Sequence, residues 1–152
     1  MIREEIKKQL IEAMKAGQKE KVDTLRLINS TIKDRDIADR TKGNMDGISD
    51  EAILSVLQGM IKQRKESIAL YTQGNRAELA AAEQKEVDII QSFLPKQMDK
   101  AEIQEAIKAA IAETGAANIK DMGKVMGLLR TKYAGQMDFA IASGEIKTLL
   151  AG

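Results

Sequence analysis

The sequence contains no cysteine and no histidine. The absence of cysteine excludes disulfide bonds, thiolate zinc sites and cysteine nucleophiles. The absence of histidine removes the commonest general base near neutral pH and the commonest metal ligand. No apolar run approaches the roughly 20 residues that span a bilayer, and the N-terminus is charged from Arg3 onward, unlike a signal peptide. We therefore expect a cytoplasmic protein with no metal, no cofactor and no membrane partner.

Aromatic residues are also scarce. Phe93, Phe139, Tyr71 and Tyr133 are the whole set, so the core must be built from aliphatic side chains and eight methionines, a mixture that suits helices. The net charge is +1, from 24 basic and 23 acidic residues. Such a balance argues against sequence-independent nucleic-acid binding over the whole surface, so any basic patch has to be local.

Apolar residues recur at helical spacing over the first 94 residues. The segment 41–47 has two glycines and no period, and is expected to be a flexible loop. The pattern predicts four helices: from Ile2 to a stop at Gly17, from about Lys19 to Arg40, from an N-cap at Ser49 to about Thr72, and from a capping pair Asn75 and Glu78 to Phe93-Leu94-Pro95.

Pro95 is the only proline and marks the predicted boundary between an N-terminal helical domain, 1–94, and a small C-terminal helical domain, 95–152. The C-terminal part is expected to hold a helix from the Asp99 and Glu102 capping box to Gly115, a short helix through Met122 and Leu129, and two brief pieces with N-caps at Asp138 and Ser143. Strand-like alternation is absent. The predicted fold class is all-α, with about four helices followed by a three- or four-helix domain.

Four pairs of residues invite a catalytic or metal-binding interpretation, and none is specific. Ser30 and Lys33 match a Ser-x-x-Lys pattern, but the companion motifs are missing and Ser30 falls within a helix, so we interpret the match as coincidence. Charged residues are 31% of the chain, so neighbouring acids are expected on solvated faces. This applies to the pairs Glu83 and Glu86, Asp34 and Asp36, and Asp46 and Asp50, the last of which lacks the ligand density of a calcium loop.

The most unusual stretch is Asp121–Arg130. Gly123 and Gly127 are four residues apart on one helix face, and each costs about 1 kcal/mol relative to alanine. Either two helices pack closely there, or a partner approaches a bare strip of backbone. Four basic residues accompany the single acid between positions 120 and 133: Lys120, Lys124, Arg130 and Lys132. They could contact a few phosphates, weakly and with strong salt dependence, or form a solvated cationic face.

The sequence resembles the GatB/YqeY group, and specifically the short free-standing YqeY-like proteins. The resemblance spans essentially the whole chain and implies an all-helical fold and a bacterial source. Its most specific block is Asp121-Met122-Gly123-Lys124-Val125-Met126-Gly127. The other blocks are 13–16, 24–28, 61–67 with Tyr71, Gly74, Arg76 and Glu83, the junction Phe93-Leu94-Pro95, and Gly135, Asp138 and Leu150.

The resemblance makes the C-terminal domain similar to the tail of the B subunit of tRNA-dependent amidotransferase, which helps to hold the misacylated tRNA. The catalytic cradle that binds ATP and magnesium in that subunit is absent here. We therefore predict a non-catalytic tRNA-binding or tRNA-handling accessory protein. Lys124 and Arg130 would contact phosphates and Gly123 and Gly127 would let the backbone approach, with Lys120 and Lys132 as further candidates. Base stacking is not expected, because its only platforms, Tyr133 and Phe139, suit the core.

Two alternatives stay open. The chain could be an adaptor that docks on an amidotransferase or an aminoacyl-tRNA synthetase through its N-terminal helices. Methionines would suit such an adaptable surface, and the candidates are Met14, Met45, Met60 and Met126. The chain could also carry the carbon–nitrogen ligase activity, with glutamine as amido donor, that the family label implies.

Overall fold

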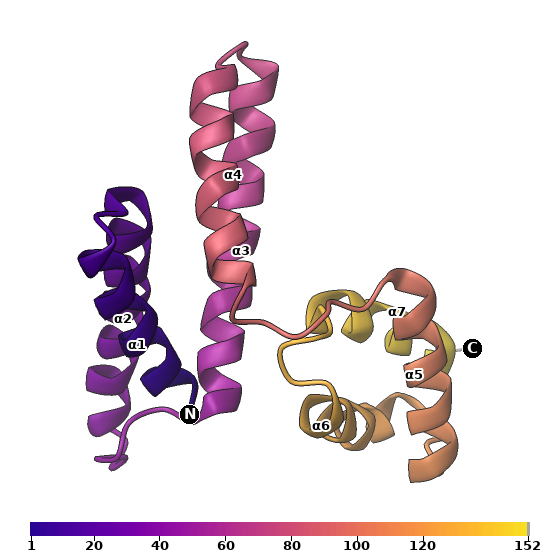
Figure 1. The fold of residues 1–152 in the computed structure, drawn as a ribbon. Helices are drawn as coiled ribbons and strands as arrows, with labels where there is room; N and C mark the ends of the chain where they lie inside the picture. The colour runs from indigo at the N-terminus through magenta and orange to yellow at the C-terminus, as the bar shows by residue number, and fades with distance from the viewer. Residues whose placement is uncertain (152) are drawn as a thin grey trace. The chain divides into compact units, whose positions relative to one another are not determined.

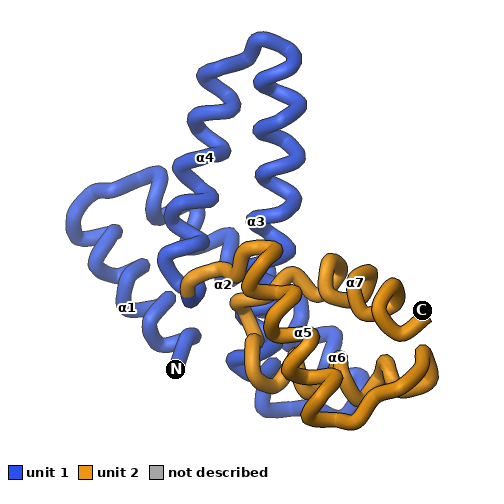
Figure 2. The backbone as a smooth tube through the Cα atoms, turned by 90° about the vertical axis from the view of Figure 1, so that its right-hand side faces the viewer, with its two compact units in different colours: residues 1–95 blue, residues 96–152 orange. Residues whose placement is uncertain are grey.

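A computed structural model describes residues 1–151 and shows two compact units, Met1–Pro95 and Lys96–Gly152 (Figure 2). Unit 1 contains α1 (Ile2–Lys15), α2 (Lys19–Arg40), α3 (Asp50–Gln73) and α4 (Ala77–Gln91). Unit 2 contains α5 (Lys100–Thr114), a 3-10 turn η1 (Ile119–Asp121), α6 (Met122–Lys132) and α7 (Phe139–Ala151). No strand occurs within residues 1–151, which confirms the predicted all-α class. The predicted boundary lies one residue before the division between the units.

Unit 1 is built from two helical hairpins (Figure 1). α3 and α4 lie side by side along much of their length, α1 packs on α2, and α2 also contacts α3 and α4. The side chains that are fully buried in this core are aliphatic, as the shortage of aromatics predicts: Ile6, Leu25, Ile28, Ile53, Leu57 and Ile90.

The turn between α3 and α4 differs from its prediction. Asn75 is not an N-cap; its φ is +57°, and it closes the C-terminal end of α3. The backbone N–H of Arg76 donates to Tyr71 O at 2.8 Å, and α4 then begins at Ala77 without a side-chain cap. Asparagine tolerates the left-handed region, so the same residue that favours a cap also favours this turn.

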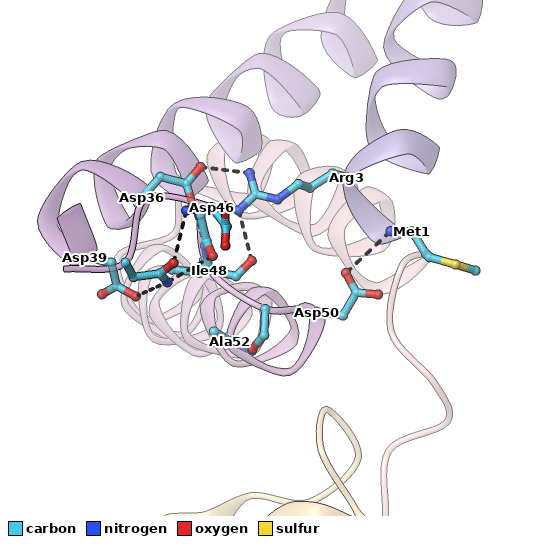
Figure 3. A network of polar contacts seen from close by, with 11 residues as sticks. Met1, Arg3, Asp36, Asp39, Asp46, Ile48, Asp50 and Ala52 are labelled. Carbon is cyan, nitrogen blue, oxygen red and sulfur yellow. Dashed lines mark hydrogen bonds and ion pairs between the residues drawn. The ribbon is translucent and has the colours of Figure 1, made fainter. Parts of the chain in front are cut away.

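A polar clamp joins three segments of unit 1 (Figure 3). The Arg3 guanidinium donates to both carboxylate oxygens of Asp36, at 2.8 and 2.6 Å, and to Ile48 O at 3.0 Å. Asp36 in turn accepts the Ile48 N–H at 2.8 Å. The clamp therefore fastens the start of α1 and the later part of α2 to the segment that leads into α3. Ile48 follows directly on the segment 41–47, so the clamp fixes the point at which that loop joins the start of α3.

Unit 2 has its own small core, formed where α5, α6 and α7 contact one another. Its fully buried members are Ile103, Ile107, Val125, Leu129, Met137, Ala142 and Ile146. The predicted capping box of α5 is present, since Asp99 accepts the Glu102 N–H at 2.8 Å and Glu102 accepts the Asp99 N–H. Gly115 ends α5 in the left-handed conformation, with φ +68°.

The two brief C-terminal pieces that the sequence predicts are one helix, α7. Asp138 acts as its predicted cap, because its carboxylate accepts the N–H groups of Ala140 and Ile141 at 2.9 and 3.3 Å. Ser143 lies inside the helix and caps nothing. Ala142, Ile146 and Leu150 are buried at helical spacing across Gly144, so packing outweighs the helix penalty of that glycine.

The Arg3–Asp36 clamp predicts a specific dependence of stability on pH. The Arg3 guanidinium and the Ile48 N–H lower the pKa of Asp36 from 3.8 to about 2. The stabilisation is therefore complete above about pH 4 and is lost as the pH falls toward 2. Asp36→Asn should lower the free energy of unfolding at pH 7 by about 2 kcal/mol. Its difference from the unchanged protein should shrink between pH 4 and pH 2, measured by urea titration.

Asp23→Asn is the matched control, because Asp23 is an exposed acid of α2 that makes no hydrogen bond or ion pair within residues 1–151. It should leave both the stability and its pH profile nearly unchanged. An equal loss of stability in the two variants would contradict the role of the clamp.

Candidate nucleic-acid interface

α6 is positioned by a tight polar turn at its start. The Asp121 carboxylate accepts the backbone N–H groups of Ala117 and Asn118, at 3.0 and 3.4 Å, and Asn118 Oδ1 accepts the Lys120 N–H at 2.9 Å. The two backbone hydrogen bonds, followed by the positive charge of Lys124, lower the pKa of Asp121. The only acid between positions 120 and 133 is therefore engaged in the turn.

The two sides of α6 differ in chemistry. Val125, Met126 and Leu129 are buried in the core of unit 2. The opposite side is exposed and carries Gly123, Gly127 and Arg130, which are spaced four and three residues apart and share one face, with Lys124 next to Gly123 and three residues before Gly127. We call these four residues the α6 strip. The helix contains no acidic residue.

The glycines of the α6 strip face open space. A Cβ atom added at Gly123 or at Gly127 would meet no atom within 4 Å. Close packing of a second helix, one of the two explanations that the sequence leaves open, is therefore wrong for residues 1–151. What remains is a stretch of exposed helix backbone that lacks side chains at two positions, on which the Gly127 carbonyl accepts a hydrogen bond from the Thr131 hydroxyl at 3.0 Å.

The structure divides the predicted cations into two groups. Lys124 and Arg130 are exposed on the strip, Lys120 is exposed on η1, and none of the three forms an ion pair with a described residue. Lys132 points elsewhere and pairs with Glu113 of α5 at 2.8 Å. That hydrogen bond raises the pKa of Lys132. Lys132 is thus a partly neutralised cation and a poorer candidate for an external anion.

A groove between α6 and α7 adjoins the strip, with a volume of about 580 Å³. Two of the predicted residues, Gly123 and Arg130, line it. The others are Met122, Met126, Phe139, Ala140 and Ser143. The sequence did not reveal this groove. Its one signal was Phe139 directly after the helix cap Asp138, and Phe139 proves to be half-buried, packed on the core and lining the groove.

The other candidate motifs are not assembled into sites. Ser30 is exposed on α2, and Asp36 belongs to the Arg3 clamp. Glu86 pairs with Arg64 Nε at 2.9 Å, and Asp50 lies 3.7 Å from the N-terminal amine. Within the described part of the chain, no group of three or more His, Cys, Asp or Glu side chains could hold a metal ion.

The four methionines proposed for an adaptable surface differ in their exposure. Met14 and Met45 are exposed, whereas Met60 and Met126 are buried and belong to the cores of their units. Met60 is therefore excluded from a docking surface of unit 1, and Met126 reaches the surface only in the lining of the groove between α6 and α7. No helix among residues 1–151 is both long enough and apolar enough to cross a membrane.

Comparisons with known proteins address the family directly. The chain is 37% identical over 90 residues to the altered inheritance of mitochondria protein 41, mitochondrial, of Vanderwaltozyma polyspora, an alignment that covers 59% of this chain and only 46% of the relative. An uncharacterized protein of Schizosaccharomyces pombe is 31% identical over 91 residues, 60% of this chain and 70% of the relative. Both relatives are fungal, so they give no support to the expected bacterial source. A sequence model of the YqeY-like proteins matches residues 3–150, and the chain therefore belongs to the YqeY-like protein family.

Proposed function

We propose that this protein is a non-catalytic accessory protein that binds tRNA through unit 2. The observation that carries the proposal is the α6 strip, where two exposed helix glycines lie beside two exposed cations that form no ion pair with a described residue. Phosphate groups of a nucleic acid suit such a surface, because Lys and Arg neutralise them and missing side chains permit a close approach. The absence of histidine and cysteine is why we do not propose amide formation by this chain alone.

The size of the patch fits an accessory role. Few cations are available, so unit 2 would make few phosphate contacts and bind weakly at physiological salt. Such contacts fix the position of an RNA without reading its sequence. The proposal needs a compartment that contains tRNA, and both the cytoplasm and the mitochondrion named for one relative meet this requirement.

A docking adaptor is the second candidate, favoured by exposed apolar side chains of unit 1. Ile11 and Met14 on α1 and Leu70 on α3 are 54%, 52% and 68% exposed. Such residues can contact a synthetase or an amidotransferase, although isolated exposed apolar residues are common on protein surfaces. A pull-down before and after nuclease treatment separates the candidates, because protein partners that survive the nuclease favour the adaptor.

Removing the two cations should weaken tRNA binding and its salt dependence together. For Lys124→Ala with Arg130→Ala, the slope of log K against log salt should fall by about 0.7–0.9 per lost phosphate contact. Titrations of bulk tRNA at a series of salt concentrations measure the slope. Lys62→Ala with Lys65→Ala removes the same charge from exposed positions of α3 and should leave the slope unchanged. Equal slopes for all three proteins would exclude the strip from tRNA binding.

Lys132→Ala tests whether a cation that already forms an ion pair contributes less to tRNA binding than one that does not. Because Lys132 is engaged by Glu113, its loss should change tRNA affinity less than the loss of Lys124. The same titration, with Lys124→Ala alone as the comparison, measures this difference. An effect of Lys132→Ala as large as that of Lys124→Ala would move the interface to the α5 side of α6.

The glycines give a test in which stability and binding should change in opposite directions. Gly127→Ala should raise the stability of the fold by about 0.5–1 kcal/mol, because alanine favours a helix and its Cβ meets open space. It should nevertheless weaken tRNA binding several-fold, because the methyl group covers the backbone. Thermal melts and tRNA titrations measure the two effects.

Gly59→Ala is the matched control. Gly59 is an interior glycine of α3, and a Cβ there also meets no atom within 4 Å. It should give a similar gain in stability and no change in tRNA affinity. If Gly127→Ala stabilises the protein without weakening binding, the bare backbone has no role at the interface.

A further inference from the structure

The groove beside the α6 strip has a chemistry of its own. Phe139 and Met122 are half-buried and give it apolar walls, and Gly123 leaves it open on the α6 side. Arg130 is the one charged residue that lines it, and no carboxylate does. The groove therefore suits a group with a flat, apolar part that contacts Phe139 and Met122 and a negatively charged part that contacts Arg130.

We infer that this groove receives one unpaired nucleotide of the bound RNA, with the base against Phe139 and its phosphate at Arg130. The inference rests on the proposed function and adds to it the form of RNA that is bound. Unpaired bases are bound in proteins by stacking on aromatic rings. The sequence alone assigns Phe139 to the core and gives no reason to expect stacking, but Phe139 packs on the core and also lines this groove.

The shape of the groove supports this occupant. It is shallow and open to solvent, so it offers a surface for one flat base and does not enclose a ligand. The groove spans about two turns of α6, from Met122 to Arg130, and its one charged lining residue is a cation, which favours an anionic nucleotide over the apolar face of a partner helix.

The surroundings of the groove connect it to the strip. Gly123 belongs to both, and Lys124 lies next to it on the exposed face of α6. A strand that leaves the groove at Arg130 can therefore place its next phosphates along the strip. Ser143 adds a hydroxyl group without a hydrogen-bond partner within residues 1–151, and such a group can donate to or accept from a base edge.

The experiment compares two RNA hairpins with the same stem, one blunt and one with a short single-stranded 3′ extension. The full-length protein should bind the extended hairpin about 5- to 150-fold more tightly, the range expected for one stacked base. Fluorescence anisotropy at one fixed salt concentration measures both affinities. A 2-aminopurine in the extension should change its fluorescence on binding, which reports stacking without any change to the protein.

Phe139→Leu tests the groove itself, because leucine can keep the core contacts of Phe139 while removing the ring. It should abolish the preference for the extended hairpin and leave the affinity for the blunt one unchanged. Tyr133→Leu is the control, since Tyr133 also packs on the core of unit 2 but does not line the groove. It should retain the preference, and a preference lost equally in both variants would overturn the inference.

The other outcomes separate this inference from the proposed function. Equal affinity for both hairpins, with binding still dependent on Lys124 and Arg130, would reject the nucleotide site in the groove and keep the proposal that the α6 strip binds RNA. Absence of binding to both hairpins and to tRNA would overturn both. A protein partner lost in Phe139→Leu, with the affinities for both hairpins unchanged, would assign the groove to protein docking and overturn the nucleotide site.

Discussion

The burial of one side of α6 is the constraint on which the candidate interface depends. Val125 and Leu129 are fully buried and Met126 is nearly so. Burying such a side chain contributes about 1.5–3 kcal/mol, whereas each helical glycine costs about 1 kcal/mol. Three buried side chains therefore outweigh Gly123 and Gly127, and α6 can carry a bare face that it could not maintain as an isolated helix. The groove follows from the same packing, because it lies where α6 meets α7.

Local electrostatics then decides which cations remain available. The chain as a whole is nearly neutral, and its net charge gives no hint of an anion site. Two local interactions create the asymmetry: Asp121 is engaged with backbone N–H groups ahead of α6, and Glu113 neutralises Lys132 on the far side. Lys124 and Arg130 are left on the exposed face without an ion pair among the described residues, and the charge of Lys124 acts on Asp121. A cation that has no internal partner loses no ion pair when it meets a phosphate, which is why these two matter more than their number suggests.

Local signals in the sequence predicted the elements that local interactions determine. The bounds of α2, the Ser49 cap, the Asp99 capping box and the Gly115 stop all depend on residues within one turn of each other. The sequence-based predictions failed where one residue type suits two local structures, or where tertiary packing determines whether a helix continues. Asn75 suits both an N-cap and a left-handed turn. Ser143 followed by Gly144 resembles the start of a new helix, but the burial of Ile146 and Leu150 keeps α7 continuous through both residues. The groove could not be predicted at all, because it is formed by residues of two helices that only tertiary packing brings together.

The two explanations of Gly123 and Gly127 illustrate what the structure adds to the sequence. If the glycines served packing, their neighbours would occupy the space that a side chain needs, and alanine would clash. The space is empty, so within residues 1–151 the fold itself gives no reason for either glycine, and alanine would be the better helix residue at both positions. Gly59 and Gly144 also face open space, so what sets Gly123 and Gly127 apart is the exposed cations and the groove beside them. The exposed glycines, the cations beside them and the groove that shares Gly123 are the three features on which the proposed RNA interface rests.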